Sequence, residues 1–170
     1  TGGKGGEDDI DGADQVGFGI YLESDSRDNI ISPSNTMNDD PIVYYYNATN
    51  ITVSDYVLTN ESNPTNYGKI TLINCTDITV SNNTVANFLG SSAETGESAS
   101  YASPGGLGAG IYLVNSTSNE LTCNDISSVH GGEGGRPGEN SVGGTGGIGA
   151  GIYLNSSLNN ELSYNNISSI

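Results

Sequence analysis

Basic residues are scarce in this chain of 170 residues. Four Lys and Arg stand against twenty Asp and Glu, and the formal net charge is −16. A surface of this sign repels a phosphate backbone, so nucleic acid is excluded as a partner. The same charge disfavours anionic membranes and attracts divalent cations.

Long apolar runs are also missing. No stretch approaches the roughly 20 apolar residues that span a bilayer, and no signal peptide is recognisable, so we expect no membrane insertion. Because Thr1 begins in mid-pattern, we expect these residues to be a mature piece or an excerpt of a longer protein.

Material for a conventional core is limited. Only 34% of the residues are apolar, Trp is absent, and Gly, Asn, Ser and Thr supply much of the remainder. This composition is poor for a layered core. The length favours a single domain over 1–170, whose core must be narrow or shared between repeats.

What the sequence does contain is a repeat. The segment GAGIYL occurs at 108–113 and at 149–154, with the variant GFGIYL at 17–22. Five segments align without gaps, and their first two apolar columns form the predicted stacking core: Ile20, Val43, Ile70, Ile111 and Ile152, then Leu22, Tyr45, Leu72, Leu113 and Leu154. A third apolar column follows ten residues after the first: Ile30, Val53, Val80, Leu121 and Leu162.

The local pattern is typical of strands and sharp turns. Apolar residues recur with a period of two, and Asn, Ser and Asp interrupt every short run. Such a unit cannot bury its apolar face alone but can do so when stacked on copies of itself. We therefore predict an all-β coil of parallel strands, with aliphatic ladders inside and Asn ladders at bends that include Asn47, Asn74 and Asn115.

These segments resemble a known family. GIYLVNSTSNELTCNDISSV, GIYLNSSLNNELSYNNISSI and GKITLINCTDITVSNNTV are similar to repeats of right-handed parallel β-helix proteins of the periplasmic copper-binding and carbohydrate-binding or sugar-hydrolase type, which are abundant among methanogen surface proteins. The resemblance covers all five segments, about two-thirds of the chain. It implies a right-handed parallel β-helix of about five turns, a scaffold rather than one activity.

The spacing between segments locates glycine-rich insertions. Successive starts are 23, 27, 41 and 41 residues apart, and the added residues stand before the first strand. We expect these insertions to emerge from one edge of the coil as extended loops able to pack closely. A join from Ile170 of one copy to Thr1 of the next would put the apolar starts 38 residues apart, which keeps the phase.

Both ends of the predicted coil lack a recognisable cap. Bare strand edges are normally hidden in soluble proteins. We therefore expect either a longer covalent solenoid or separate copies stacked end to end.

An acidic cluster gives one candidate metal site. Asp9, Asp11 and Asp14 surround Gly12, and carboxylates at this spacing can bind Ca²⁺. The alternative is a solvated acidic loop. We expect no other cofactor, because GTGGIG at 144–149 precedes a strand instead of opening a helix, which argues against a dinucleotide site.

Copper, which the resemblance suggests, does not fit the residues. One His (His130), one Met (Met37) and two Cys cannot build the soft or imidazole site that copper prefers. Cys75 and Cys123 occupy different positions in the repeat, so we expect buried or half-buried thiols, with a disulfide as the alternative.

Catalytic residues are hard to find. Glu120 and Glu161 share a column about 5 Å apart and are the only enzymatic candidates, against a reading as outward-facing residues on a wet face. Tyr44 and Tyr46 are expected outside the coil, where they could stack on sugar or on a neighbour.

Asn-X-Ser/Thr sites are frequent and favour glycosylation in a secreted protein. The candidate acceptors are Asn60, Asn47, Asn50, Asn82, Asn155 and Asn166, and Asn60 is expected to be the most accessible. Asn74 and Asn115 also lie in such sites, but a side chain that takes part in the predicted Asn ladder could not also carry a glycan.

The sequence thus predicts a non-enzymatic structural unit of an extracellular fibre, sheath or surface layer, whose partners are copies of itself and glycans. It would stack end to end and use the glycine-rich loops as lateral contacts. A carbohydrate-binding or polysaccharide-degrading β-helix is the first alternative, and a calcium-dependent adhesin is the second.

Overall fold

A computed structural model of the chain describes residues 19–20, 29–61, 67–93, 102–136 and 142–170. These residues form strands, turns and bends and contain no helix, which confirms the prediction of an all-β chain. Accordingly, this part of the chain has no helix that could cross a membrane. Asp9, Asp11, Asp14 and Leu22 lie outside the described residues.

Three four-stranded parallel sheets dominate the structure. The first sheet contains β3 (Val43–Tyr46), β6 (Ile70–Ile73), β9 (Gly108–Val114) and β12 (Gly149–Asn155). The second contains β4 (Thr52–Ser54), β7 (Thr79–Ser81), β10 (Glu120–Thr122) and β13 (Glu161–Ser163). The third contains β5 (Val57–Leu58), β8 (Thr84–Leu89), β11 (Asp125–His130) and β14 (Asn166–Ser168).

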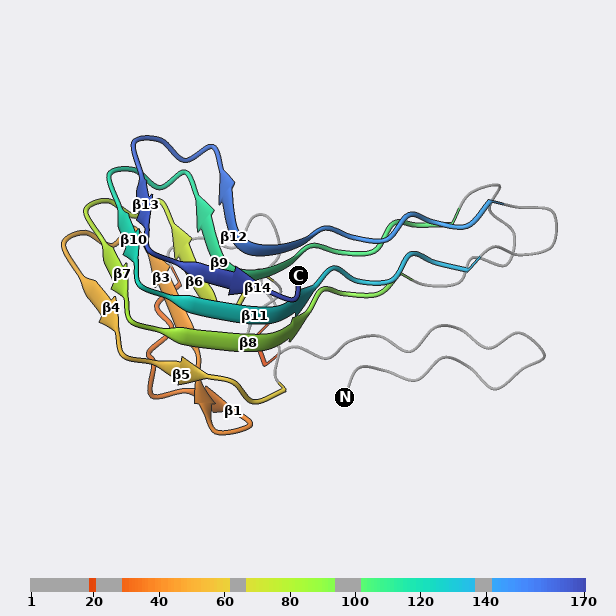
Figure 1. Cartoon of the computed structure of the whole chain (residues 1–170), viewed down its shortest axis with the longest axis horizontal. Helices are drawn as coiled ribbons and strands as arrows, with labels where there is room; N and C mark the ends of the chain where they lie inside the picture. The colour runs from red at the N-terminus through yellow and green to blue at the C-terminus, as the bar shows by residue number, and fades with distance from the viewer. Residues whose placement is uncertain (1–18, 21–28, 62–66, 94–101, 137–141) are drawn as a thin grey trace.

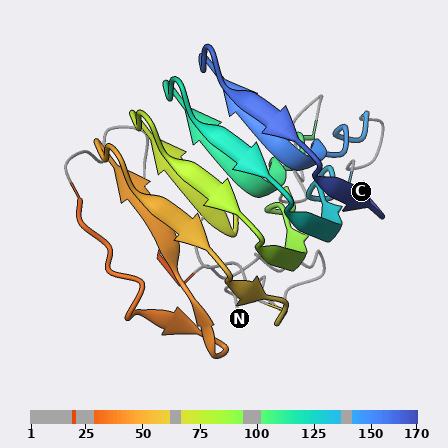
Figure 2. The ribbon, with the colours of Figure 1, turned by 60° about the vertical axis from the view of Figure 1, so that its left-hand side comes forward.

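The chain visits the three sheets in rotation, and each visit to all three is called a pass below (Figure 1). The first pass is β3, β4 and β5, and the fourth is β12, β13 and β14. Figure 2 shows corresponding strands of successive passes side by side. The register follows the sequence alignment, since Val43 pairs with Ile70, Ile70 with Ile111, and Ile111 with Ile152.

The core lies between the sheets and is formed by the aligned apolar columns. In the first three passes these side chains are fully buried, except Tyr45, which is partly buried and packs against the core: Val43, Val53, Leu58, Ile70, Leu72, Val80, Val85, Ile111, Leu113, Leu121 and Ile126. In the fourth pass the same columns are partly exposed, to 36% at Leu154 and 45% at both Leu162 and Ile167. The first and fourth passes therefore differ in how far their core side chains are buried.

The corners are built by residues with positive φ. Asn47, Asn74 and Asn115 have φ between 48° and 53°, a conformation that Asn tolerates better than most residues. Asn74 and Asn115 are exposed, so the buried amide ladders described below do not include them. Their inverted backbone turns the next residue inward instead, and it is Cys75 and Ser116 that are buried.

The segment before β3 departs from the repeat. Ile30, predicted to stack on Val53, is 98% exposed and lies outside any strand, whereas Ile20 is half-buried. A short antiparallel hairpin of β1 (Thr36–Met37) and β2 (Asp40–Pro41) follows. The structure thus describes four stacked passes, and Ile30 does not take part in a fifth.

Glycine-rich segments form a long projection from the sheets (Figure 1). Four of its segments are described: 90–93, 102–107, 131–136 and 142–148. They continue the strand ends of β8 and β11 outward and return to β9 and β12. We call these four segments the glycine arm.

Candidate functional site: the glycine arm and the open face of the fourth pass

The glycine arm is held together by backbone hydrogen bonds between its segments. The N–H groups of Ala102, Gly105 and Gly108 donate to the carbonyls of Val142, Thr145 and Ile148, at 2.8 to 3.0 Å. Gly132 donates to Gly106 at 2.9 Å, and Gly147 donates to Gly132 at 2.8 Å. The donors recur at every third residue, so the arm is an ordered array in its described part.

Close approach explains why this array needs glycine. None of the described glycines has positive φ, so conformational freedom is not the reason. A Cβ on Gly132 would instead collide with the carbonyl oxygen of Ser91, and one on Gly147 with that of Gly106. At Gly146 the nearest atom to such a Cβ would be 3.8 Å away, so this position faces outward.

Among the described residues, no strand pairs with the outer edges of β12, β13 and β14. We define the open face as this outer side of β12, β13 and β14 together with arm segment 142–148. Large apolar side chains are exposed in these segments and in the turns between them: Val142, Ile148, Leu154, Leu158, Leu162, Tyr164, Ile167 and Ile170. Exposed large apolar side chains in such numbers are typical of an interaction site.

Two ladders of buried amides run through the stack toward the open face. Asn83 donates from Nδ2 to Oδ1 of Asn124, and Asn124 donates from Nδ2 to Oδ1 of Asn165, both at 2.9 Å. Asn119 donates to Oδ1 of Asn160 both from its backbone N–H and from Nδ2, each at 2.9 Å. The amide oxygens of Asn124, Asn160 and Asn165 thus each accept two hydrogen bonds from the preceding pass, whereas those of Asn83 and Asn119 each accept one, from the backbone N–H of Tyr56 and of Ile78.

The ladders end with unused donors. Asn160 and Asn165 each give one amide hydrogen to a carbonyl of the preceding pass, that of Ser116 and that of Leu121. Within the described part of the chain, their backbone N–H groups and second amide hydrogens meet no acceptor. The open face therefore presents the same pattern of donors that Asn119 and Asn124 of the third pass direct at the fourth.

A tyrosine ladder follows the outer side of the first sheet. The rings of Tyr112 and Tyr153 stack with centroids 5.4 Å apart and planes 2° from parallel. Tyr67 stacks on Tyr112 from the other side, also at 5.4 Å, and so supplies a ring beside Thr71, the aligned residue that has none. Burial raises the pKa of Tyr112.

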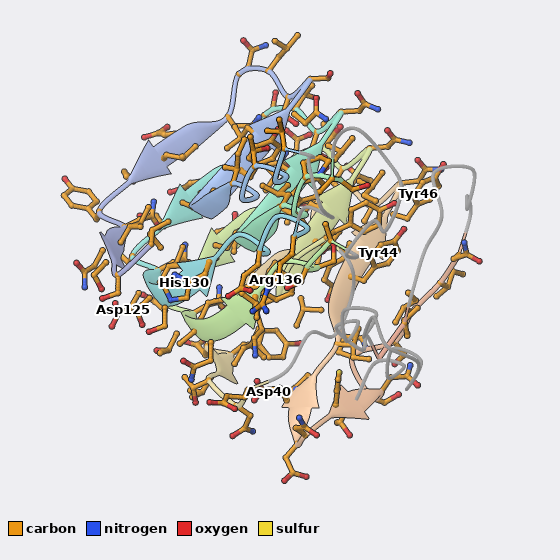
Figure 3. The ribbon with its side chains drawn as sticks, turned by 90° about the vertical axis from the view of Figure 1, so that its right-hand side faces the viewer. Asp40, Tyr44, Tyr46, Asp125, His130 and Arg136 are labelled. Atoms are coloured by element: carbon orange, nitrogen blue, oxygen red, sulfur yellow. The ribbon has the colours of Figure 1, made fainter. Side chains whose placement is uncertain are left out.

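Tyr44 starts the same outer column but is only 2% exposed, so its ring is not accessible to a sugar. Burial is the main cause that raises its pKa to about 12, and Tyr67 adds to the effect. Tyr46 is half-buried. Figure 3 shows Tyr44 and Tyr46 close together on β3, with Asp40 well separated from both.

The predicted catalytic pair lies where the alignment placed it. Glu120 and Glu161 are directly paired in the second sheet, and both are exposed. No described group of three or more His, Cys, Asp or Glu side chains could hold a metal ion, and the calcium candidates lie outside the described residues. The calcium hypothesis therefore stays a prediction.

The remaining candidates are dispersed. His130 is exposed at the end of β11 where the arm begins, Asp125 lies at the opposite end of the same strand, and Arg136 is further along the arm (Figure 3). Both cysteines are free, and Cys75 is buried as expected, whereas Cys123 is exposed because its positive φ of 55° turns it outward.

The six predicted glycosylation sites are all exposed: Asn47, Asn50, Asn60, Asn82, Asn155 and Asn166. The amide nitrogen of Asn60, however, already donates to the carbonyl of Asn38 at 2.6 Å and to Oδ1 of Asp40 at 3.0 Å. That nitrogen is the atom that would carry the glycan. Asn74 and Asn115 are also exposed, so they are better placed to carry a glycan than the sequence predicted.

Several functional features escaped sequence reasoning. The amide ladder members Asn83, Asn119 and Asn124 each follow a residue at a corner, and this offset of one was the available signal. The buried pair of Lys69 and Asp40 had no signal, because the two residues are 29 positions apart and outside the repeat. Comparison with family models, with curated proteins and with solved structures gave no match.

Proposed function

We propose that this chain is a structural unit of an extracellular fibre, sheath or surface layer, built by end-to-end stacking of parallel β-helical units. The fold in this proposal is a right-handed parallel β-helix whose coils are the four passes. It is a closed solenoid with one edge extended by the glycine arm. No catalytic activity is part of the proposal.

The contrast between the third and fourth passes supports this function best. Leu113, Leu121 and Ile126 are fully buried, because a further pass covers them. Their counterparts Leu154, Leu162 and Ile167 are exposed by 36% to 45%. Burying three aliphatic side chains contributes several kcal/mol at about 25 cal/mol per Å². A further pass would also pair the free edges of three sheets.

Assignment to the cell exterior draws on surface chemistry. The net charge of −16 keeps units soluble before assembly. Exposed Asn-X-Ser/Thr sites at the corners, such as Asn50, Asn74 and Asn115, offer attachment points for glycans in an oxidising, secreted setting. Glycans on corners would leave the strand edges free for stacking.

Carbohydrate recognition is the second candidate, and the tyrosine ladder is the observation that favours it. The stacked tyrosine rings, whose centroids are 5.4 Å apart, form a regular strip of apolar ring faces and polar hydroxyl groups. Aromatic ring faces pack well against sugar rings. In a ladder, however, neighbouring rings cover most faces, and only the outer face of Tyr153 is left for a ligand. The paired Glu120 and Glu161 stand on a different sheet, so they do not combine with the ladder into one site.

Assembly can be tested by sedimentation and electron microscopy of the native chain over a range of concentrations. The proposal predicts filaments or elongated oligomers. Leu162→Glu, which places a charge on the open face, should abolish them, and Val57→Glu, on an exposed first-pass position, should not. Circular dichroism must show strands in both variants. Discrete monomers of the native chain at every concentration would refute the proposal.

A further inference from the structure

The open face has a specific complement in the sequence. We propose that it receives residues 1–28 of a second copy, which extend the glycine arm and add a strand and its following corner to the first sheet. This inference rests on the proposed end-to-end assembly and names the segment that makes the contact. It uses only the sequence positions of residues 1–28.

The first argument is the match between the two glycine patterns. Residues 130–135 read HGGEGG and residues 1–6 read TGGKGG, with glycine in the same four positions. In the arm, a Cβ on Gly131 would collide with the carbonyl of Gly147, and one on Gly134 with that of Gly144. Gly2 and Gly5 meet this requirement in the second copy. Few other segments of the chain could.

Charge supports the same register. Ala93 donates from its N–H to the carbonyl of Glu133, so Glu133 is stacked on the preceding pass and its exposed side chain faces solvent. In the alignment with residues 130–135, Lys4 of the second copy occupies the column of Glu133. Stacked neighbours are about 4.8 Å apart, a distance at which opposite charges attract. The chain has only four Lys and Arg, and one of them stands at this column.

Hydrogen-bond complementarity at the corners is the third argument. A second alignment sets Gly17 opposite Gly149, because the stretch between the two matches is three residues shorter in 1–28. It places Asp25 in the column of Ser157 and Asp28 in the column of Asn160. Asn160 directs two donors at its missing successor, as Asn119 directs two donors at Oδ1 of Asn160. The carboxylate of Asp28 can accept both, and hydrogen bonds to a charged acceptor are the stronger kind.

The outer column continues as well. Tyr21 of the second copy falls on Tyr153, whose outer ring face has no partner among the described residues, and would extend the stack of parallel rings. Ile20 and Leu22 fall on Ile152 and Leu154 and would bury them. Every class of group left open on the fourth pass, apolar, amide and aromatic, thus has a matching residue in this segment.

Site-directed cross-linking tests the contact. In a Cys123→Ser background, Lys4→Cys protein is mixed with Glu133→Cys protein and oxidised mildly. Stacked columns put the two Cα atoms within the range that a disulfide bridges. We expect a covalent dimer from this mixture and none when Glu61→Cys, also exposed but on the first pass side, replaces Glu133→Cys. Equal yields from both mixtures, or none from either in an assembled sample, would overturn the inference.

A second test measures the protein concentration at which variants of Asp28 begin to assemble. Asp28→Asn keeps an acceptor oxygen, as in the interior ladder, and should shift this concentration less than threefold. Asp28→Leu keeps the size but removes the acceptor and should raise it at least tenfold. Filaments insensitive to Asp28→Leu would contradict the inference and leave end-to-end assembly standing. A native chain that never assembles would refute both this inference and the proposed end-to-end assembly.

Discussion

Lys69 and Asp40 form an ion pair in the interior, with Nζ 3.1 Å from Oδ2 and both side chains almost completely buried. Asn60 completes the cluster, because its carbonyl accepts from Nζ at 2.6 Å and its backbone N–H donates to Asp40 at 3.1 Å. Burial lowers the pKa of Lys69, and the hydrogen bond and charge of Asp40 oppose that shift. The cluster ties the β1–β2 hairpin to the residue preceding β6.

Removing one partner should therefore be costly. Asp40→Asn leaves a buried ammonium without its counter-ion and is expected to lower the free energy of unfolding by about 3 kcal/mol or more. Asp39→Asn is the matched control, since Asp39 is exposed and Asn tolerates its positive φ of 70°. Urea denaturation should show that Asp39→Asn lowers the free energy of unfolding by less than about 0.5 kcal/mol. Equal losses in the two variants would mean that the ion pair makes no specific contribution to stability.

The amide ladder predicts a sharp distinction between two asparagines. Asn124 is buried and donates to the carbonyl of Val80 and to Asn165, both at 2.9 Å. Asn124→Asp removes both donors and aims a charge at a carbonyl, so we expect a loss of about 3 kcal/mol at neutral pH. Asn115→Asp changes an exposed corner and should be nearly neutral. Thermal unfolding of both variants measures the difference.

For Asn124→Asp the pH dependence gives a further check. One oxygen of the new carboxyl keeps the two donors of Asn83, but the other faces the acceptor oxygens of Val80 and Asn165. Burial and these oxygens should raise its pKa, so the variant should recover stability as the pH falls. Loss of stability at low pH, in excess of that of the native chain, would contradict the ladder geometry.

Two neighbouring glycines should respond differently to the same methyl group. Gly132→Ala would force its Cβ against the carbonyl of Ser91 and separate the arm segments. Gly146→Ala has 3.8 Å of clearance and should be neutral or stabilise by about 0.5 kcal/mol through the unfolded state. Hydrogen exchange reports the outcome, because the amides of Gly132 and Gly147 should lose protection only in Gly132→Ala. Unchanged protection in both variants would mean that the arm is not an array.

Alkaline pH should destabilise the tyrosine column. The folded pKa of Tyr44 is raised from 10.0 to about 12, so the folded state holds its proton more tightly than the unfolded state. This stabilisation is complete below pH 10 and is lost between about pH 10 and 12. Over that range Tyr44 alone should lower the free energy of unfolding by on the order of 2 kcal/mol. Tyr44→Phe should flatten that part of the profile. Lys69 titrates in both proteins and cancels in the comparison.

The repeat made most of the stack predictable. Period-two apolar residues in fixed columns anticipated which residues pair across the three parallel sheets, down to Val43 with Ile70 and Glu120 with Glu161. That worked because a parallel register is set by the same columns that fill the core. The pattern did not hold at Ile30, where Pro33 and the β1–β2 hairpin replace the expected stack.

Features that depend on side-chain direction or on distant partners were not predictable in the same way. A positive φ at Asn74 moves the inward position by one residue, so the ladder was assigned to the exposed column. Tyr67 enters the tyrosine column from a connecting segment, which no alignment of strands could indicate. The order within the glycine arm comes from contacts between backbone atoms. A sequence shows where glycine stands, but it does not show which backbone groups pair.

The inward corner positions change in character along the chain. In the first pass they are Ala48, Ile51 and Tyr56, which pack against the core, and in the last they are Ser157, Asn160 and Asn165. Each pass that carries ladder residues completes the hydrogen bonds of the pass made before it. The apolar corners of the first pass thus need no amide acceptor from a later one, whereas each ladder residue receives its donors from a pass that is synthesised earlier. The direction of translation and the direction of the ladders coincide, so we expect the coils to fold in order from the first pass to the fourth.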